Sequence, residues 1–257
     1  MEVFKYLLQM FNTKSALTRQ ISLFSLVGIM VICLNNYTSS WTNMLFDNFY
    51  ITPPANHIYI KVSLFIAFLI FFYLTGYGYK LFGSVSYDGK FSMPEFSLEP
   101  FTAFFKMILL FSVWLFYYAA IISVVCLLLY DYHNIMCYYV FYSIMLCLLP
   151  FVFIIFTEFA QNFKYEIKYF NVFYLFKILD KCLGDVIFLS LEVLISLIIT
   201  VVLIYTVFLY SLNIKQEIWQ FGVRYFGICL SVYVFTVLNY IYHIGLAKIA
   251  KTKFNQE

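Results

Sequence analysis

Few residues of this sequence are suited to chemistry, and Glu192 is the most unusual of them because it lies inside a long apolar run. It falls about six residues into the run 186–212, roughly 9 Å along a helix axis at 1.5 Å per residue. His243 and Asn239, in the last apolar run, reach about the same depth from the same side. Ser196 follows Glu192 by one helical turn. A carboxylate and an imidazole at that depth would suit a site that binds or moves a proton or a substrate.

The alternative interpretation of Glu192 is structural. A charged carboxylate inside a membrane costs at least about 2.5 kcal/mol, so this residue must be protonated, paired or exposed to water. A hydrogen bond from Glu192 to another helix would fix packing without any further role. Asp185, Ser196 and Thr200 fall near the same helical face as Glu192, so this run has a polar seam under either interpretation.

No known catalytic motif accompanies these residues. The sequence contains no phosphate-binding loop, no HExxH and no GxSxG. Its six cysteines form no CxxC or CxxH pair, and five lie in apolar runs, where a thiol behaves as a small hydrophobic group. The net charge of +3 comes from scattered basic residues, which argues against nucleic acid. The sequence therefore predicts no enzyme, no cofactor, no metal site and no nucleic-acid partner.

The elements that must position Glu192 are membrane helices. The chain is 64% hydrophobic and 11% charged, with a mean hydropathy of +0.88, whereas a soluble domain carries about 25% charged residues. Helices of about 20 apolar residues span the hydrocarbon core, and uninterrupted apolar runs do not fit the alternation of barrel strands. We predict an all-α polytopic integral membrane protein, a single membrane domain over 1–257 with six transmembrane helices at about 20–35, 58–82, 107–130, 135–157, 186–212 and 221–247.

The basic residues are distributed unevenly about these six runs. Thirteen of the sixteen Lys and Arg residues fall on one side, and only Lys61, Lys215 and Arg224 fall on the other. Because positive charge is retained on the cytoplasmic side of membranes, we predict that both termini are cytoplasmic.

Amphipathic segments adjoin the spans on the predicted cytoplasmic side. The segments 1–19, 97–106 and 170–184 place apolar residues at helical spacing, so each should lie in the membrane interface before a span begins. Ser97 is expected to cap the second of them. Glu158, at the inner end of the fourth span, is expected to be a solvated helix-end charge. A unit of surface helix, outward span, loop and return span thus occurs three times, without residue-level similarity between the units.

The segment that follows the second span has the strongest local pattern, and we call it the elbow (residues 76–106). Gly78 and Gly83 allow a helix to end or to approach another closely. Asp88 and Gly89 form a turn pair, and Pro94 stiffens the entry to the next helix. Under a structural interpretation, this pattern predicts a cytoplasmic connection of fixed shape. Under a functional interpretation, the connection would also dock a soluble partner such as an ATPase.

The elbow resembles the uncharacterised membrane proteins of domain-of-unknown-function family 4013. About a third of the chain carries this resemblance, through Gly76, Tyr77, Gly89, Pro94, Glu95, Phe96 and Lys106. Gly78 and the Tyr-rich helix ends depart from the family pattern. The resemblance implies a bacterial or archaeal polytopic membrane protein and supplies no catalytic residues. It therefore favours a bacterial cytoplasmic (inner) membrane, with an organelle inner membrane as the alternative for a chain so rich in Phe and Tyr.

These observations lead to one predicted function and two alternatives. We predict a non-enzymatic integral membrane subunit, either a transport component or a scaffold, that contacts membrane lipids and docks protein partners on its cytoplasmic face. The first alternative is the permease half of an ATP-driven exporter, coupled to a cytoplasmic ATPase through residues 98–105. The second is a membrane-embedded lipid-modifying enzyme that uses Glu192 and His243, against which the scarcity of ionisable residues argues.

Overall fold

The computed structural model of this protein describes residues 2–12, 15–46, 57–129, 135–211 and 217–254. Within these ranges the chain is helical and contains no strand. The elements in chain order are α1 (Glu2–Phe11), α2 (Ala16–Phe46), α3 (His57–Gly83), α4 (Glu99–Leu129), α5 (Ile135–Asn162), the short 3₁₀ helix η2 (Ile167–Phe170), α6 (Val172–Ser211) and α7 (Glu217–Phe254).

Six of the described helices are long and apolar enough to cross a membrane. The apolar windows are Ala16–Leu34, Lys61–Gly83, Glu99–Leu127, Tyr138–Asn162, Val172–Thr206 and Tyr225–Phe254. Each exceeds or approaches the 20 residues that span the hydrocarbon core. The predicted fold class, an all-helical polytopic membrane protein, is therefore confirmed.

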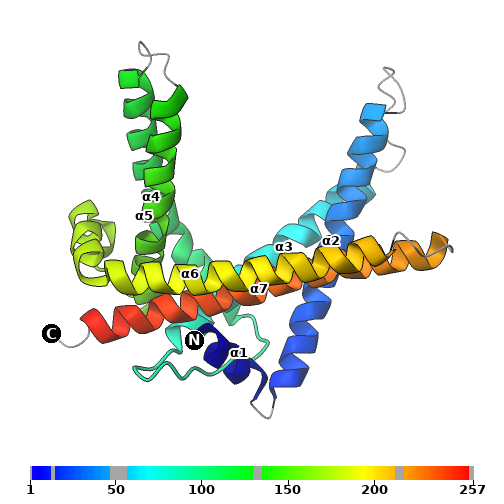
Figure 1. Cartoon of the computed structure of the whole chain (residues 1–257), viewed down its shortest axis with the longest axis horizontal. Helices are drawn as coiled ribbons and strands as arrows, with labels where there is room; N and C mark the ends of the chain where they lie inside the picture. Colours follow the sequence, from blue (N-terminus) through cyan, green and yellow to red (C-terminus); the bar gives the residue numbers. More distant parts are fainter. Residues whose placement is uncertain (1, 13–14, 47–56, 130–134, 212–216, 255–257) are drawn as a thin grey trace.

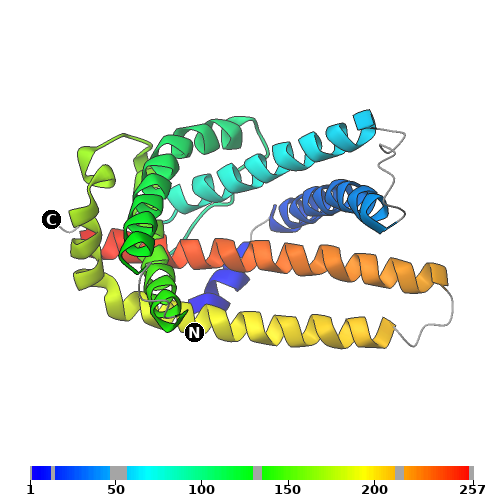
Figure 2. The same cartoon turned by 90° about the horizontal axis from the view of Figure 1, so that it is seen from above.

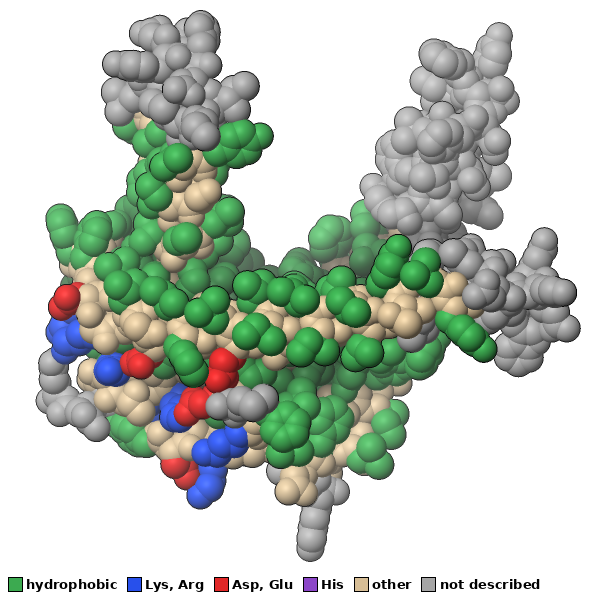
Figure 3. Space-filling view, viewed as in Figure 1, with side chains coloured by type: hydrophobic (Ala, Val, Ile, Leu, Met, Phe, Trp, Pro, Cys, Tyr) green, Lys and Arg blue, Asp and Glu red, His purple; other side chains and the backbone are tan. Residues whose placement is uncertain are grey.

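The six long helices form three antiparallel hairpins that diverge from a common end (Figures 1 and 2). In Figure 1, α4 and α5 rise on the left, α2 and α3 rise on the right, and α6 and α7 cross the front. We call the common end the base; it comprises α1, the connectors 84–98 and 163–171, and the C-terminal end of α7. Charged side chains gather at this end of the face drawn in Figure 3.

Two predicted surface helices are continuous with the spans that follow them. Residues 99–129 form the single helix α4, and residues 172–211 form the single helix α6. Neither junction contains a proline, and Gly184 lies inside α6 without interrupting it. The predicted first surface segment divides differently, because α1 ends at Phe11 and α2 begins at Ala16.

The most densely packed part of the protein lies near the base. Tyr77, Phe159 and Ile244, from α3, α5 and α7, are all completely buried. Gly83 makes this packing possible, because a Cβ atom there would lie 2.4 Å from the backbone oxygen of Ala160. By contrast, only 6% of the apolar α6 window is buried inside the protein. Most of the apolar α6 window is therefore not covered by the other described helices of this chain.

Candidate functional site

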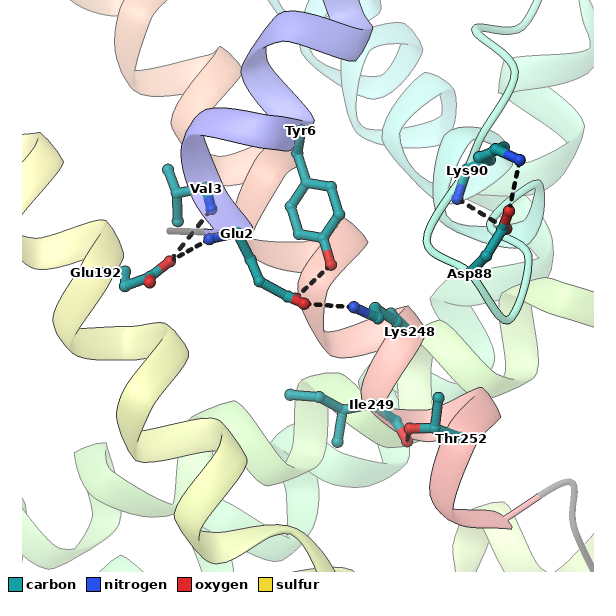
Figure 4. Close-up of polar contacts among 9 residues, drawn as sticks. All are labelled: Glu2, Val3, Tyr6, Asp88, Lys90, Glu192, Lys248, Ile249 and Thr252. Carbon is teal, nitrogen blue, oxygen red and sulfur yellow. Dashed lines mark hydrogen bonds and ion pairs between the residues drawn. The ribbon is translucent and has the colours of Figure 1, made fainter.

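Glu192 lies against the N-terminus of α1. Its Oε2 atom accepts hydrogen bonds from the backbone N–H groups of Glu2 at 3.0 Å and of Val3 at 3.2 Å (Figure 4). The first N–H groups of a helix have no acceptor within the helix, and the helix dipole favours negative charge at that end. The carboxylate of α6 thus caps α1, a helix that lies 190 residues away in the sequence.

A second carboxylate extends this network to α7. Glu2 forms an ion pair with Lys248 and accepts a hydrogen bond of 2.7 Å from the hydroxyl of Tyr6 (Figure 4). Burial alone would raise the pKa of Glu2, but the hydrogen bonds from Lys248 and Tyr6 outweigh burial and lower it from its usual 4.5. Burial raises the pKa of Tyr6, and the bond to Glu2 adds to the increase. These contacts join α1, α6 and α7 at the base.

His243 lies in a different environment from Glu192. It is 7% exposed and stacks on the ring of Phe82 in α3, with 4.7 Å between ring centroids. The ring of Phe153 in α5 meets it edge-on at 4.8 Å. Its Nδ1 atom is buried with no hydrogen-bond partner among the described residues. The imidazole therefore packs among aromatic rings of α3 and α5, whereas Glu192 faces α1.

The other two predicted members of the intramembrane site are Ser196 and Asn239. Ser196 donates its hydroxyl hydrogen bond to the backbone oxygen of Glu192, one turn earlier in α6, at 2.9 Å. Asn239 is exposed on α7. The described contacts of Glu192 thus resemble those expected under the packing interpretation, while its role as a proton or substrate site stays a prediction.

The polar seam of α6 lines a groove beside α1. Glu192, Ser196 and Thr200 face a cavity of about 550 Å³ whose other walls are apolar side chains of α1 and α7, among them Val3, Phe4, Leu7, Phe11, Val234, Val237 and Leu238. Asp185, the first member of the seam, lies in a smaller neighbouring cavity of about 300 Å³. Glu192 borders both cavities. It therefore marks the point where an apolar groove meets the polar base.

The first part of the elbow is tightly packed. A Cβ atom on Gly76 would lie 1.8 Å from the backbone oxygen of Pro100, so α3 and α4 touch at this glycine. Tyr77 is completely buried and donates a hydrogen bond of 3.0 Å from its hydroxyl to the backbone oxygen of Pro94. Its ring stacks on Phe96 at 5.4 Å between centroids. Four of the predicted elbow residues, Gly76, Tyr77, Pro94 and Phe96, thus belong to one packed unit.

The turn of the elbow rests on α1 and α7. Gly89 adopts a φ of +78°, which favours glycine, and its Cβ position lies 3.2 Å from both Tyr6 and Lys248. Asp88 pairs with Lys90 at 2.8 Å (Figure 4). Hydrogen bonds from Lys90 and from the Ser86 hydroxyl lower the pKa of Asp88. The turn is therefore closed by its own side chains and held against the network around Glu2.

Two predicted elbow residues lie on the surface instead. Glu95 is exposed. Lys106 is also exposed, and its Nζ atom lies 5.6 Å from the centroid of the Phe163 ring, in the connector between α5 and η2. The backbone oxygen of Lys106 accepts a hydrogen bond of 2.7 Å from the hydroxyl of Tyr165. These two residues are therefore exposed and do not belong to the packed unit.

Glu158 is a polar site that the sequence interpretation misjudged. The expectation of a solvated helix-end charge is wrong, because Glu158 is only 4% exposed. It forms an ion pair with Lys168 at 2.7 Å and accepts a hydrogen bond of 2.8 Å from the hydroxyl of Tyr174. Burial would lower the pKa of Lys168, but its bond to Glu158 raises it above the usual value. No sequence signal identified Lys168 as a partner of Glu158, because the connector 163–171 has no helical periodicity from which to infer its path.

The chain is thus a polytopic helical membrane protein whose base is held together by a polar network. The described residues include no group of three or more His, Cys, Asp or Glu side chains that could hold a metal ion. The chain matches no protein-family model, no curated protein and no solved structure. The resemblance to family 4013 therefore stays a prediction.

Proposed function

We propose that this protein is a non-enzymatic integral membrane subunit, a transport component or scaffold of a larger complex, and that soluble proteins dock on its base. The observation that carries the proposal is the segregation of charge. Ion pairs join α1 to α7, α3 to α4, α5 to the following connector and α6 to α7, all at the base. The outer part of α6 presents exposed apolar side chains such as Leu203. Among the described residues, the ion-paired groups that a water-soluble partner could contact therefore lie at the base.

The elbow is the proposed contact surface. Tyr87 and Leu98 are 51% and 78% exposed, close in sequence to the charged residues Lys90, Glu95 and Glu99. Exposed apolar side chains close to charged ones are typical of protein-interaction sites. The backbone of this segment is fixed by Tyr77 and by the Gly89 turn, so a partner would bind a preformed surface at little cost in ordering.

The proposed orientation places the base in the cytoplasm of a bacterial cell, because the excess of Lys and Arg marks the cytoplasmic side of a membrane. A cytoplasmic ATPase is then one candidate partner, and its presence would favour the permease half of an exporter. The described neighbours of Glu192 and His243 lend no support to the lipid-modifying alternative, because the carboxylate bonds to α1 and the imidazole packs among rings.

Site-specific photo-crosslinking in native membranes tests the docking proposal. A photoreactive amino acid replaces Leu98 in the elbow or, as a matched control, Leu203 in α6, which is 62% exposed. We expect the probe at position 98 to capture a distinct soluble protein and the probe at position 203 to capture only lipid. A competing excess of the captured protein should abolish the adduct.

Two results would count against the proposal. If both probes yield only lipid adducts in a folded protein, the elbow faces the bilayer and docks nothing. If a membrane-impermeant reagent added outside intact cells labels a cysteine at position 98, the base lies on the other side of the membrane. Capture of an ATPase at position 98 would favour the exporter alternative. ATP-dependent transport in reconstituted vesicles would then test that alternative.

A further inference from the structure

α1 is attached to the rest of the protein in a way that suits a movable strap. Its C-terminal end continues into α2 after a short connection, and its other end is held by the carboxylate of Glu192. One face buries Val3, Tyr6 and Met10. The other face leaves Phe4 and Leu8 about half exposed. α1 is therefore held by one buried face together with polar contacts at its N-terminal end.

The length of α1 makes its structure depend on this seat. It contains ten residues, and helices shorter than about 12–15 residues are marginal in water without tertiary contacts. Its first N–H groups have an acceptor only because Glu192 lies opposite them. The ion pair between Glu2 and Lys248 provides a second anchor to α7. Docking and helix formation in α1 are thus coupled.

Two other parts of the protein depend on where α1 lies. Phe4, Leu7 and Phe11 form one wall of the groove of about 550 Å³ along α6 and α7. The ring of Tyr6 also supports the elbow turn, where it lies 3.2 Å from the Cβ position of Gly89. Movement of α1 would therefore open the groove and remove a support from the elbow at the same time.

We propose that α1 is a strap that exchanges between a docked and a released position, with Glu192 as the positioning residue that sets the balance. In the docked position α1 closes one side of the groove and supports the Gly89 turn. In the released position the seam of Glu192, Ser196 and Thr200 is open to the surroundings. Through the strap, Glu192 in α6 would control the position of α1 and, with it, the support of the Gly89 turn at the base.

Hydrogen–deuterium exchange of the full-length protein in detergent tests this inference. Glu192→Gln keeps an acceptor but removes its charge, and charged hydrogen bonds are stronger than neutral ones by roughly 1 kcal/mol. We expect exchange in residues 2–11 to become about fivefold faster, with a smaller increase in residues 84–92. Asp185→Asn is the matched control, because it neutralises a carboxylate of α6 that pairs with Lys253 rather than with α1.

A second variant tests the same inference at the other anchor of α1, in case Glu192→Gln does not fold. Lys248→Gln removes the other anchor, so it should also speed exchange in residues 2–11. Unchanged exchange in that segment, in both the Glu192→Gln and Lys248→Gln proteins, would overturn the inference. Equal acceleration in the α4 segment 107–127 would also overturn it, because that pattern reports general loosening. The measurement uses no partner protein, so its outcome is independent of the docking function proposed above.

Discussion

Replacement of Gly76 by alanine should separate α3 from α4 and destabilise the protein. The added Cβ atom would lie 1.8 Å from the backbone oxygen of Pro100, whereas real Cβ contacts essentially never fall below 3.0 Å. The two helices must therefore move apart by more than 1 Å. The obstacle is backbone, so no side-chain rotation can relieve it. Overpacking of this kind costs about 1–3 kcal/mol or more.

Gly28→Ala is the control that separates the overpacking cost at Gly76 from other effects of replacing glycine by alanine. Gly28 also lies inside a membrane-spanning helix, α2, but a Cβ atom there would meet nothing within 4 Å. Both substitutions gain up to about 1 kcal/mol of helix propensity, and this gain cancels when the two variants are compared. The Gly76→Ala protein should therefore be less stable than the Gly28→Ala protein by the overpacking cost alone.

Thermal unfolding in detergent, followed by size-exclusion chromatography, measures this difference. We expect the Gly76→Ala protein to lose its monodisperse peak at a clearly lower temperature than Gly28→Ala and wild type. Equal midpoints for the two variants would refute the close approach of α3 and α4 at the elbow. A small-to-large series at position 76, through Ser and Val, should lower the midpoint progressively.

Three further predictions follow from the polar contacts at the base. Tyr77→Phe keeps the stacked ring and removes the hydroxyl bond to the backbone oxygen of Pro94, so stability should fall by about 0.5–1.5 kcal/mol, measured by thermal unfolding; an unchanged midpoint would contradict it. Glu158→Gln weakens a buried contact to Lys168 and should cost about 1–3 kcal/mol, whereas Glu166→Gln, at an exposed pair with the same lysine, should change little. The pKa of Glu2 is lowered on folding, so its contribution is complete above its usual 4.5 and is lost as the pH falls through the folded value. Exchange in residues 2–11, corrected for the intrinsic pH dependence, should therefore accelerate below about pH 4.5, and constant protection down to pH 3 would disprove it.

Sequence patterns predicted those features that depend only on residues close together in the sequence: the spans, the turn and the helix cap. Uninterrupted apolar runs predicted six spans, because a helix in lipid must satisfy its backbone internally and needs about 20 apolar residues. The Asp88–Gly89 pair predicted a turn, and the structure has Gly89 at a positive φ. Ser97 was expected to cap the helix that follows, and its hydroxyl accepts a hydrogen bond of 3.3 Å from the N–H of Glu99.

Patterns were less informative where the outcome depends on a distant segment. Depth along a helix placed Glu192 and His243 at one level, but depth does not say which way a side chain points. Glu192 meets residues near the start of the chain, and His243 meets Phe82 and Phe153. Glu158 was misjudged for the same reason, since Lys168 reaches it from a connector whose path no periodicity describes.

The sequence by itself determined that this protein is a bundle of membrane helices with most of its positive charge on one side. Hydrophobic run length and charge distribution are properties of the chain that hold for any packing of the helices. Only the tertiary structure decided that a carboxylate of α6 caps α1, that the Gly89 turn rests on Tyr6 and Lys248, and that α3 and α4 touch at Gly76. Those contacts arise from the mutual placement of segments far apart in sequence, which is set by side-chain packing in three dimensions and not by any local periodicity.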